Sequence, residues 1–490
     1  ADTVYGDEVS FTTLPVAPMV STEAVTEITT STATGNGNIT DLGVPDPTQH
    51  GVCWNTTGSP DVFDSKTEEG TATVTGAFTS AITGLSAYTT YYVCTYAINV
   101  ADTVYGDEVS FTTLPVAPTI TTQAATEISS TTATGNGNIT DLGIPDPTQH
   151  GVCWNTTGSP DAFDSKTEEG AATVTGAFTS AITGLSAYTT YYVRAYAINV
   201  ADTVYGDEVS FTTLPVAPTV TTQAVTDITT STATGNGNIT DLGVPDPTQY
   251  GLCWNTTGSP DVFDNKTEEG AATTTGSFTS AITGLLTYTT YYVRAYAINA
   301  ADTVYGNEVS FTSMPVAPEV TTQVVTDITG NTATGNGNIT ILGIPNPTQY
   351  GVCWNTEENP TVANDKTEEG EALATGAFTS AITGLLPNTT YYVRAYATNE
   401  AGTSYGTEVS FTTNLFYGSG TVGIPYEIAT LADLQLLSGN TSYWDKNYIQ
   451  TVDIDASETS SWNSGAGFDP IGYSTPFTGT YNGQGHTISG

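Results

Sequence analysis

The stretch Leu185-Ser-Ala-Tyr-Thr-Thr-Tyr191-Tyr-Val-Arg-Ala-Tyr-Ala-Ile-Asn199 decides the fold of this chain. From Tyr191 to Asn199 the type of side chain alternates with a clear period of two. Arg194, for example, stands between Val193 and Ala195. Successive side chains of an extended strand point to opposite faces of a sheet. The alternation therefore predicts a β-strand over residues 191–199.

The residues upstream of this strand predict more strands and several turns. Thr119–Ile128 alternates small β-formers with polar residues, and Thr132–Thr140 does so less regularly. Turn signals stand at Asn136-Gly137, Gly143–Pro147, Gly158–Asp161 and Gly184. The run Thr134–Gly137 lacks the following helix and Lys of a phosphate loop, so a turn or bulge is predicted there. No segment of this repeat has a helical stripe, and short strands at this spacing indicate a β-sandwich.

The whole pattern repeats with a period of 100 residues. The string ADTVYGDEVSFTTLPVAP, which begins at Ala1, returns unchanged at Ala101 and Ala201 and in altered form at Ala301 and Ala401. Residues 1–100 and 101–200 differ at nine positions in their first halves and four in their second, 13 in all. A specialised catalytic site normally occurs once, whereas length, charge and multivalent binding add up when a module is copied.

The end of each repeat carries a family resemblance. Leu185–Asn199, and still more Leu385–Asn399 with its Leu-Leu-Pro-Asn-Thr-Thr-Tyr string, resembles the E–F corner and F strand of fibronectin type III domains. The resemblance implies an immunoglobulin-like sandwich in which a tyrosine hydroxyl bonds to upstream backbone, the tyrosine corner. The Gly151-Val-Cys-Trp154 variant resembles tandem modules of large surface proteins from Bacteroidetes-type bacteria. The residues implied as tyrosine corners are Tyr91, Tyr191, Tyr291 and Tyr391.

These observations divide the chain into modules. Residues 1–13 are expected to be the C-terminal strand of a truncated repeat, and 414–490 the start of a different, truncated domain. We read the chain as a segment of a longer secreted protein. The four complete fibronectin-type-III-like repeats are expected at 14–113, 114–213, 214–313 and 314–413.

Residues 414–490 change character. Leu431, Leu434 and Leu437 share one face, and Thr430 with Asp433 has the spacing of a capping box, which predicts a short amphipathic helix. Strands are predicted over Tyr448–Asp455 and within Phe477–Ile488. The string Phe477-Thr-Gly-Thr-Tyr-Asn-Gly-Gln-Gly-His-Thr-Ile488 resembles the opening coils of right-handed parallel β-helices that bear Gly-Leu-Uncharged-Gly motifs. That resemblance implies a β-helix whose open end the helix caps.

The composition excludes several classes of function. The chain holds 50 Asp and Glu against 8 Lys and Arg, a net charge of −42, which argues against a nucleic-acid partner and against an anionic membrane surface. It also holds 38% hydrophobic residues and 28 Tyr, too many for a disordered acidic tail. No apolar run reaches the length of a membrane span. The composition therefore indicates an extracellular all-β protein without catalytic residues.

The acidic residues recur in sets that would suit a calcium ion, which takes six to eight oxygen ligands. No Asp-x-Asp-x-Asp-Gly loop is present, however, and Val362-Ala-Asn-Asp365 breaks the pattern in the fourth repeat. We therefore assign no catalytic, cofactor-binding or metal-binding residue and expect ordinary solvated carboxylates, with a minor calcium contribution left open. The sets are Asp61, Asp64, Glu68 and Glu69; Asp41 and Asp46; and Asp7 and Glu8.

Cysteine and histidine residues are expected to be structural. Cysteines that precede a tryptophan occur once per repeat and read as small buried hydrophobic residues. Only the first repeat has a second cysteine, Cys94, and a Cys53–Cys94 bridge stays open. His50 and His150 become Tyr250 and Tyr350 in later copies, a change that a catalytic or metal-binding role would not tolerate. The five cysteines are Cys53, Cys94, Cys153, Cys253 and Cys353.

These features together predict a non-catalytic extracellular stalk of a bacterial surface or secreted adhesin-like protein. The stalk would present a β-helical head, and surface glycans or proteins would be partners of that head. The alternative is an accessory region, a spacer or a carbohydrate-binding part, of a secreted polysaccharide-degrading enzyme. Membrane insertion of this segment is not expected.

Overall fold

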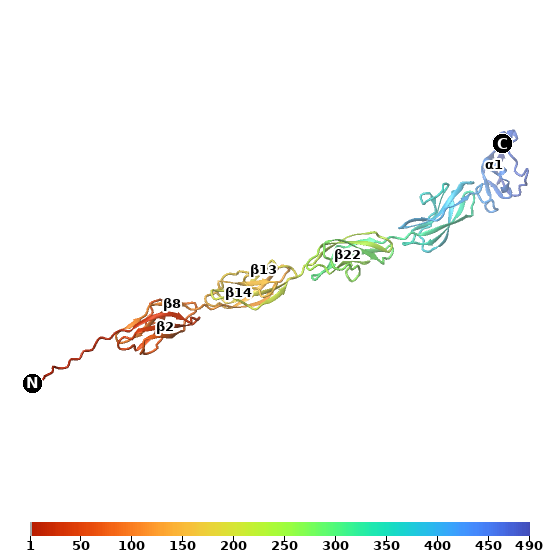
Figure 1. Ribbon diagram of the computed structural model, residues 1–490. Coiled ribbons are helices and arrows are strands. Elements are labelled where there is room, and N and C mark those ends of the chain that lie inside the picture. Colours follow the sequence, from red (N-terminus) through yellow and green to blue (C-terminus); the bar gives the residue numbers. More distant parts are fainter. Residues whose placement is uncertain (1) are drawn as a thin grey trace. The chain divides into compact units, whose positions relative to one another are not determined.

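The computed structural model describes residues 2–490, and strands dominate it. The second repeat contains two antiparallel sheets. One has the order β13-β10-β9, and the other β12-β11-β14-β15, with β16 also paired to β14. In Figure 1 the labels β13 and β14 mark one strand from each sheet. The strands are β9 (Thr119–Thr126), β10 (Thr132–Asp141), β11 (Gln149–Asn155), β12 (Ser165–Lys166), β13 (Gly176–Thr183), β14 (Thr190–Ile198), β15 (Thr203–Tyr205) and β16 (Val209–Thr212).

The same pair of sheets recurs in the other three repeats. The first contains β1 (Met19–Thr26), β2 (Thr32–Asp41), β3 (Gln49–Asn55), β4 (Ser65–Lys66), β5 (Gly76–Thr83), β6 (Thr90–Ile98), β7 (Thr103–Tyr105) and β8 (Val109–Thr112). The third contains β17 (Thr219–Thr226), β18 (Thr232–Asp241), β19 (Gln249–Asn255), β20 (Asn265–Lys266), β21 (Gly276–Thr283), β22 (Thr290–Ile298), β23 (Thr303–Tyr305) and β24 (Val309–Thr312). The fourth contains β25 (Glu319–Thr326), β26 (Thr332–Ile341), β27 (Gln349–Asn355), β28 (Asp365–Lys366), β29 (Gly376–Thr383), β30 (Thr390–Asn399), β31 (Gly402–Tyr405) and β32 (Val409–Thr412).

A three-stranded sheet packed on a larger one is the fibronectin type III and immunoglobulin-like arrangement, which confirms the all-β class and the tandem sandwiches. The predicted strand at residue 191 is β14, in the middle of the larger sheet. Val193, Ala195 and Ala197 are buried on its inner face, as its period of two requires. Tyr196, on the outer face, is also fully buried, because a loop crosses that face.

The tyrosine corner is present in every complete repeat. The backbone N–H of Ser186 donates to the hydroxyl of Tyr191 at 3.0 Å, five residues upstream. Ser86, Leu286 and Leu386 donate in the same way at 2.8 to 3.0 Å. Each corner tyrosine also stacks on a phenylalanine of the last strand, for example Tyr191 on Phe211 with 5.9 Å between ring centroids. The bond fixes the entry into the central strand.

The predicted turn at Asn136-Gly137 is wrong. Both residues lie within β10, which pairs continuously with β13 from Thr132 to Ile139. A bulge is present, because the register with β9 shifts between Thr134 and Asn136. The glycines serve packing, since a Cβ on Gly137 would lie 2.4 Å from the Phe178 ring. A strand that faces a bulky partner uses glycine for close approach rather than for a turn.

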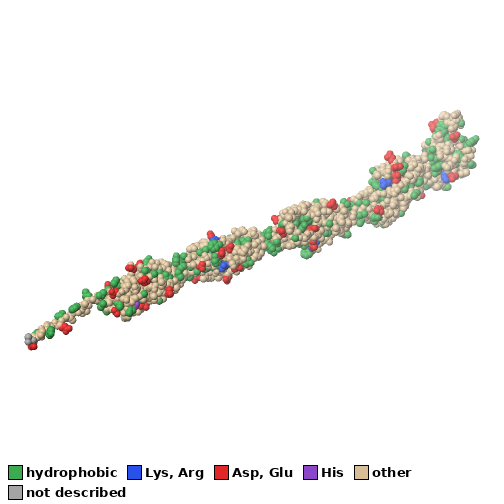
Figure 2. All heavy atoms as spheres, viewed as in Figure 1, with side chains coloured by type: hydrophobic (Ala, Val, Ile, Leu, Met, Phe, Trp, Pro, Cys, Tyr) green, Lys and Arg blue, Asp and Glu red, His purple; other side chains and the backbone are tan. Residues whose placement is uncertain are grey.

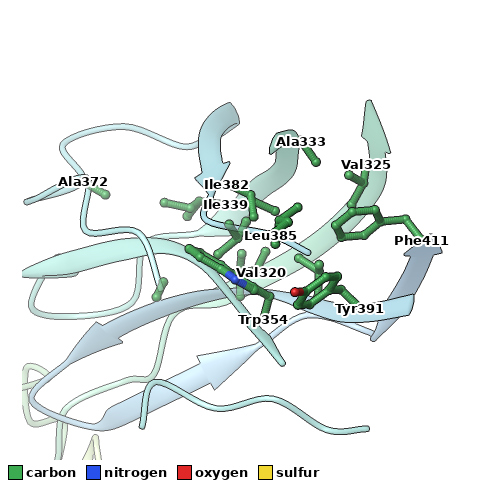
Figure 3. Close-up of a cluster of buried hydrophobic side chains, with 14 residues drawn as sticks. Val320, Val325, Ala333, Ile339, Trp354, Ala372, Ile382, Leu385, Tyr391 and Phe411 are labelled. Atoms are coloured by element: carbon green, nitrogen blue, oxygen red, sulfur yellow. The ribbon is translucent and has the colours of Figure 1, made fainter. Parts of the chain in front are cut away.

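Each repeat has its own hydrophobic core between its two sheets. Figure 3 shows the core of the fourth repeat, where Trp354, Ile382 and Tyr391 from different strands meet. The equivalent cluster of the second repeat includes Val152 and Ile182, both fully buried. A core that closes within about 100 residues is the size expected of an independently folding domain.

Residues 2–13 form no strand and are exposed. Their counterparts in the first repeat include β8, which pairs with β6 from Thr90 to Val93. No strand within the described residues 2–490 pairs with this segment. The segment expected to be the C-terminal strand of a truncated repeat is therefore extended chain without sheet pairing.

The module after residue 413 has a different architecture. Its strands β33 (Tyr426–Ile428), β34 (Asn447–Gln450) and β36 (Thr480–Asn482) pair in parallel, as do β35 (Ile454–Asp455) and β37 (Ile488–Ser489). The short helices are α1 (Leu431–Gly439), η1 (Thr441–Tyr443), η2 (Ser457–Ser461) and η3 (Asn463–Gly465).

The helix prediction is confirmed. Asp433 N–H donates to the Thr430 hydroxyl at 3.1 Å, and the Asp433 carboxylate accepts from Thr430 N–H at 2.8 Å, a complete capping box. Leu434 and Leu437 are buried against an aromatic cluster that includes Phe416 and Tyr448.

The two long strands predicted in this module are each two shorter ones. Residues 451–453 separate β34 from β35, and there the Gln450 side chain donates to the Val452 carbonyl at 2.8 Å, which holds the corner. Gln484 and Gly485 have φ values of 49° and 83°, so they turn the chain between β36 and β37. The side chain of His486, just after this turn, is exposed and lies 3.4 Å from the Asp453 carboxylate.

Candidate functional site

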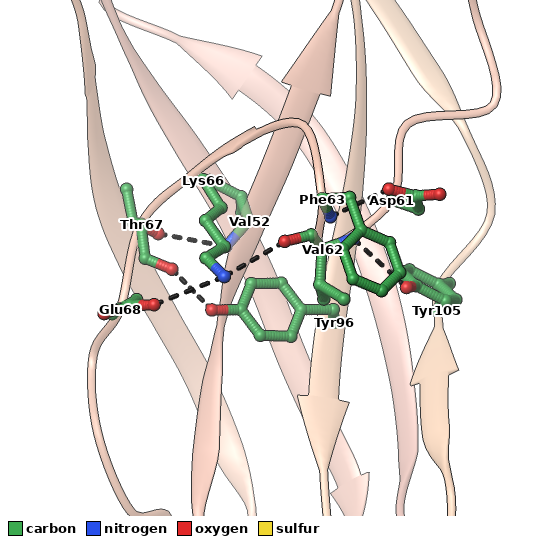
Figure 4. A network of polar contacts seen from close by, with 9 residues as sticks. All are labelled: Val52, Asp61, Val62, Phe63, Lys66, Thr67, Glu68, Tyr96 and Tyr105. Carbon is green, nitrogen blue, oxygen red and sulfur yellow. Dashed lines mark hydrogen bonds and ion pairs between the residues drawn. The ribbon is translucent and has the colours of Figure 1, made fainter.

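The acidic residues singled out in the sequence lie mainly on residues 56–70, here called the acidic loop, which include the two-residue strand β4. It crosses the outer face of the larger sheet of the first repeat (Figure 4). Thr67 N–H donates to the Val52 carbonyl at 2.9 Å, and the Tyr96 hydroxyl donates to the Thr67 carbonyl at 2.6 Å. Burial of Tyr96 beneath this loop raises the pKa of its hydroxyl.

The first two acids of the loop shape a tight turn. Asp61 accepts from Phe63 N–H at 2.8 Å, and Asp64 accepts from Asp61 N–H at 3.1 Å and from the Asn55 amide at 2.8 Å. Short Asp and Asn side chains stabilise turns in this way, by bonding backbone two or three residues away. Both carboxylates therefore act as acceptors within the fold.

The two glutamates that follow point to different partners. Glu68 forms an ion pair with Lys66 at 3.3 Å, and both side chains are solvent-accessible, so the pair contributes little to stability. Glu69 accepts from the Ser80 hydroxyl at 2.8 Å. The four acids of the set thus have separate partners and do not converge on one point.

The remaining predicted acids are also scattered. Asp41 accepts from Gly43 N–H at 2.8 Å, Asp46 is exposed, and Asp7 and Glu8 lie in the exposed segment 2–13. Within residues 2–490 no three His, Cys, Asp or Glu side chains come close enough to hold a metal ion. Figure 2 shows acidic side chains dispersed over the visible face.

One glutamate per repeat was missed. Glu108 accepts from the backbone N–H of Ser59 and so ties the acidic loop to the segment between β7 and β8. Glu208, Glu308 and Glu408 make the same contact with the later copies of the loop. The acidic loop and this glutamate are 49 residues apart, and no local pattern connects them.

The cysteines are buried free thiols, as expected of small hydrophobic residues. Cys53 and Cys94 lie opposite one another on β3 and β6, in direct register, and both are unbridged. Burial raises the pKa of Cys53 to about 12 and that of Cys94 to about 11. Such thiols are protonated at neutral pH and are poor nucleophiles.

In repeats two to four an arginine replaces the second cysteine. Arg194 donates to the Gly206 carbonyl at 2.9 Å, and its guanidinium lies 4.6 Å from the centre of the Tyr205 ring. Arg294 and Arg394 make the same cation–π contact at 4.5 Å. In three of the four repeats, therefore, the chain's own arginine packs its guanidinium group on a tyrosine ring at the outer face of this sheet.

The two histidines are structural. The His50 ring bonds the Gly70 carbonyl at 2.8 Å and stands edge-on to Phe78, and His150 repeats both contacts. Tyr250 packs on Phe278 in the same edge-on geometry, which explains why tyrosine replaces histidine here.

A shallow groove recurs beside these aromatic residues. In the first repeat it has a volume of about 240 Å³ and is lined by Ile39, His50 and residues 71–78. Copies of about 230 Å³ lie in the second and third repeats. In the first repeat half of its lining residues are Thr or Ala, and the histidine is the only titratable one. The groove of the first repeat therefore contains no acid–base pair.

Comparisons with known proteins give limited similarity. No protein-family model matches the chain. It is 49% identical over 88 residues to Halomucin of Haloquadratum walsbyi, a match that covers 17% of this chain and 1% of Halomucin. No described helix has the length and apolar character needed to cross a membrane.

Solved structures of tandem domains are also similar. The FN1–FN3 domains of chicken CNTN1 share 13% identity at a TM-score of 0.22 and cover 61% of this chain and 98% of theirs. A set of consecutive domains from titin shares 18% identity at a TM-score of 0.24 and covers 61% of this chain and 99% of its own.

Proposed function

We propose that this chain is a non-catalytic extracellular stalk, a spacer within a bacterial surface or secreted adhesin-like protein, which presents a β-helical head. The observation that carries the proposal is the copying of one self-contained sandwich. Each complete repeat has its own core and its own tyrosine corner. Copying such a module adds length without a new active site.

The junctions between repeats support a spacer. Leu114 N–H donates to the Thr29 carbonyl of the first repeat at 3.0 Å, while Val116 N–H donates to the Ile144 carbonyl of the second at 2.8 Å. Only Pro115 separates the two anchored residues, and its ring fixes φ. Met314 and Val316 bond the third and fourth repeats in the same way around Pro315. So short a connection limits bending.

The module after residue 413 supports a β-helical head. Its strands pair in parallel and its helix carries a complete capping box. An apolar cavity of about 290 Å³ opens beside Leu437, Phe477 and Ile488. Further coils of a β-helix would cover this surface, since apolar area that faces water is costly. Partners, in this proposal, are surface glycans or proteins bound by the head.

The acidic composition and the match to Halomucin support a surface or secreted location. The second candidate is an accessory region of a secreted polysaccharide-degrading enzyme, whose β-helix would carry the active site. The recurring grooves of repeats one to three would support this second candidate only if the repeats act as a carbohydrate-binding spacer.

Deletion of repeats in the full-length protein tests the proposal. Removal of residues 114–213, one whole period, should shorten the distance between cell surface and head by one repeat, measured by electron microscopy of a labelled head. Ligand binding by the isolated head should not change. An unchanged distance would overturn the spacer, and polysaccharide cleavage by the full-length protein would favour the second candidate.

A further inference from the structure

The acidic loop carries a large aromatic side chain that the fold does not use. Phe63 is 94% exposed, and its copies Phe163 and Phe263 are 98% and 94% exposed. In each copy both faces of the ring are open to solvent, whereas Phe111 and Phe211 are only 7% exposed. The ring follows Asp61 and precedes Asp64, whose carboxylates flank it in sequence.

The backbone that bears this ring is held in place by four consecutive bonds. Asp61 N–H donates to the Asp64 carboxylate at 3.1 Å. Phe63 N–H donates to the Asp61 carboxylate at 2.8 Å, and Asp64 N–H donates to the Asp61 carbonyl at 3.1 Å. Val62 N–H donates to the Tyr105 hydroxyl at 3.1 Å, which anchors the turn to β7. Figure 4 shows two of these bonds, from Phe63 N–H to Asp61 and from Val62 N–H to the Tyr105 hydroxyl. The second and third repeats repeat all four bonds, so the ring sits on a preorganised support in three copies.

The fourth repeat shows that neither the ring nor its carboxylates are needed for the turn. There Thr361, Ala363 and Asn364 take the places of Asp, Phe and Asp. Thr361 N–H donates to the Asn364 side chain at 2.9 Å, Ala363 N–H to the Thr361 hydroxyl at 3.3 Å, and Val362 N–H to the Tyr405 hydroxyl at 3.2 Å. The aromatic ring and both charges disappear together, while the fold stays the same.

Charge complementarity selects the kind of partner. The chain has a net charge of −42, so a second copy or an anionic partner would be repelled. The nearest cation on the loop, Lys66, is already bonded to Glu68 and to the Val62 carbonyl at 3.0 Å. The face of an aromatic ring attracts cations, and neighbouring carboxylates strengthen that attraction. Arg194 over Tyr205 shows the same chemistry within the second repeat.

We propose that the turns bearing Phe63, Phe163 and Phe263 form three equivalent binding sites for a cationic polypeptide, each ring stacking on a guanidinium group flanked by two aspartates. The site is absent from the fourth repeat, where Ala363 takes the place of the ring. The sites lie along the copied modules and act together on a partner that carries several arginines. This proposal stands apart from the role of the chain as a spacer.

The test uses the full chain and a fluorescent peptide of alternating arginine and glycine at about 0.15 M ionic strength. The combined substitution Phe63→Ala, Phe163→Ala and Phe263→Ala should weaken binding by about twofold to fivefold per ring engaged. Triple Phe→Leu should match Phe→Ala, because leucine is apolar but has no ring face. Triple Phe→Trp should bind as tightly as the native chain or more tightly.

The fourth repeat allows a matched variant that should gain a binding site. Thr361→Asp with Ala363→Phe and Asn364→Asp should add a fourth site and tighten binding. Unfolding midpoints of all variants should match that of the native chain, since the rings are exposed.

Two results would overturn the proposal. Equal binding by the native chain and the triple Phe→Ala variant would show diffuse attraction to the acidic surface. Self-association of the native chain that the same variant abolishes would make a second copy the occupant.

Discussion

Substitution of Tyr191 by phenylalanine tests the folding unit most sharply. The ring would stay buried and stacked on Phe211, so the substitution removes only the bond from Ser186 N–H, 3.0 Å long. One such bond contributes about 1 kcal/mol net, and the orphaned N–H is only partly buried. For a domain of this size that loss lowers the unfolding midpoint by about 4–8 °C.

The assay is differential scanning calorimetry of residues 114–217, a range that keeps the bond from Leu214 N–H to the Ser129 carbonyl. Tyr192→Phe is the matched control, because Tyr192 is the next residue on the same strand and lies on its other face. Its hydroxyl makes no hydrogen bond to any residue that the structure describes. We expect the control to stay within a few tenths of a kcal/mol. Equal midpoints for the native domain and Tyr191→Phe, or an equal drop in the control, would refute the reasoning.

Three further predictions follow from the packing and the charge of the repeats. Gly137→Ala should destabilise the second repeat by about 1–3 kcal/mol in urea unfolding, since its Cβ would lie 2.4 Å from the Phe178 ring; no loss would mean that the strands separate easily. Burial raises the pKa of Cys153 to about 12, so the neutral thiol is favoured in the fold. The stability that comes from keeping this thiol neutral is complete at a pH below the pKa of the thiol in the unfolded chain. It is lost as the pH rises from there through about 12. At neutral pH a thiol reagent should label it only through unfolding, and labelling at the rate of a free thiol would contradict its burial. Added sodium chloride should raise the unfolding midpoint by screening carboxylates, and calcium chloride at equal ionic strength should add little. A large rise specific to calcium would show that the acids form a site.

The sequence predicted the features that depend on nearby residues. The alternation after Tyr191 yields a strand because side-chain direction follows a fixed period, and the hydroxyl bond of the corner spans only five residues. The capping box of Thr430 and Asp433 was likewise predictable, since both partners lie within one helical turn.

The features that sequence reasoning missed depend on distant contacts. Tyr196 is buried on the outer face because the second repeat's copy of the acidic loop covers it, and Glu208 holds that copy from 49 residues away. Asn136-Gly137 has the composition of a turn, yet its glycine makes room for Phe178 on a neighbouring strand. The acidic sets were expected to be ordinary solvated carboxylates, yet Asp61, Asp64 and Glu69 accept hydrogen bonds from separate partners within the fold.

The measurement that tests the central claim most directly is small-angle X-ray scattering of residues 14–413, the four predicted repeats. The account predicts four sandwiches held end to end by anchored, proline-containing junctions. Strands of roughly nine residues make each repeat ~30 Å long, so the four reach ~120 Å or more with a radius of gyration near ~35 Å. A compact arrangement of the same chain would have a radius of gyration of about 21 Å. A value near the larger figure supports a stiff spacer, and one near the smaller figure would contradict it.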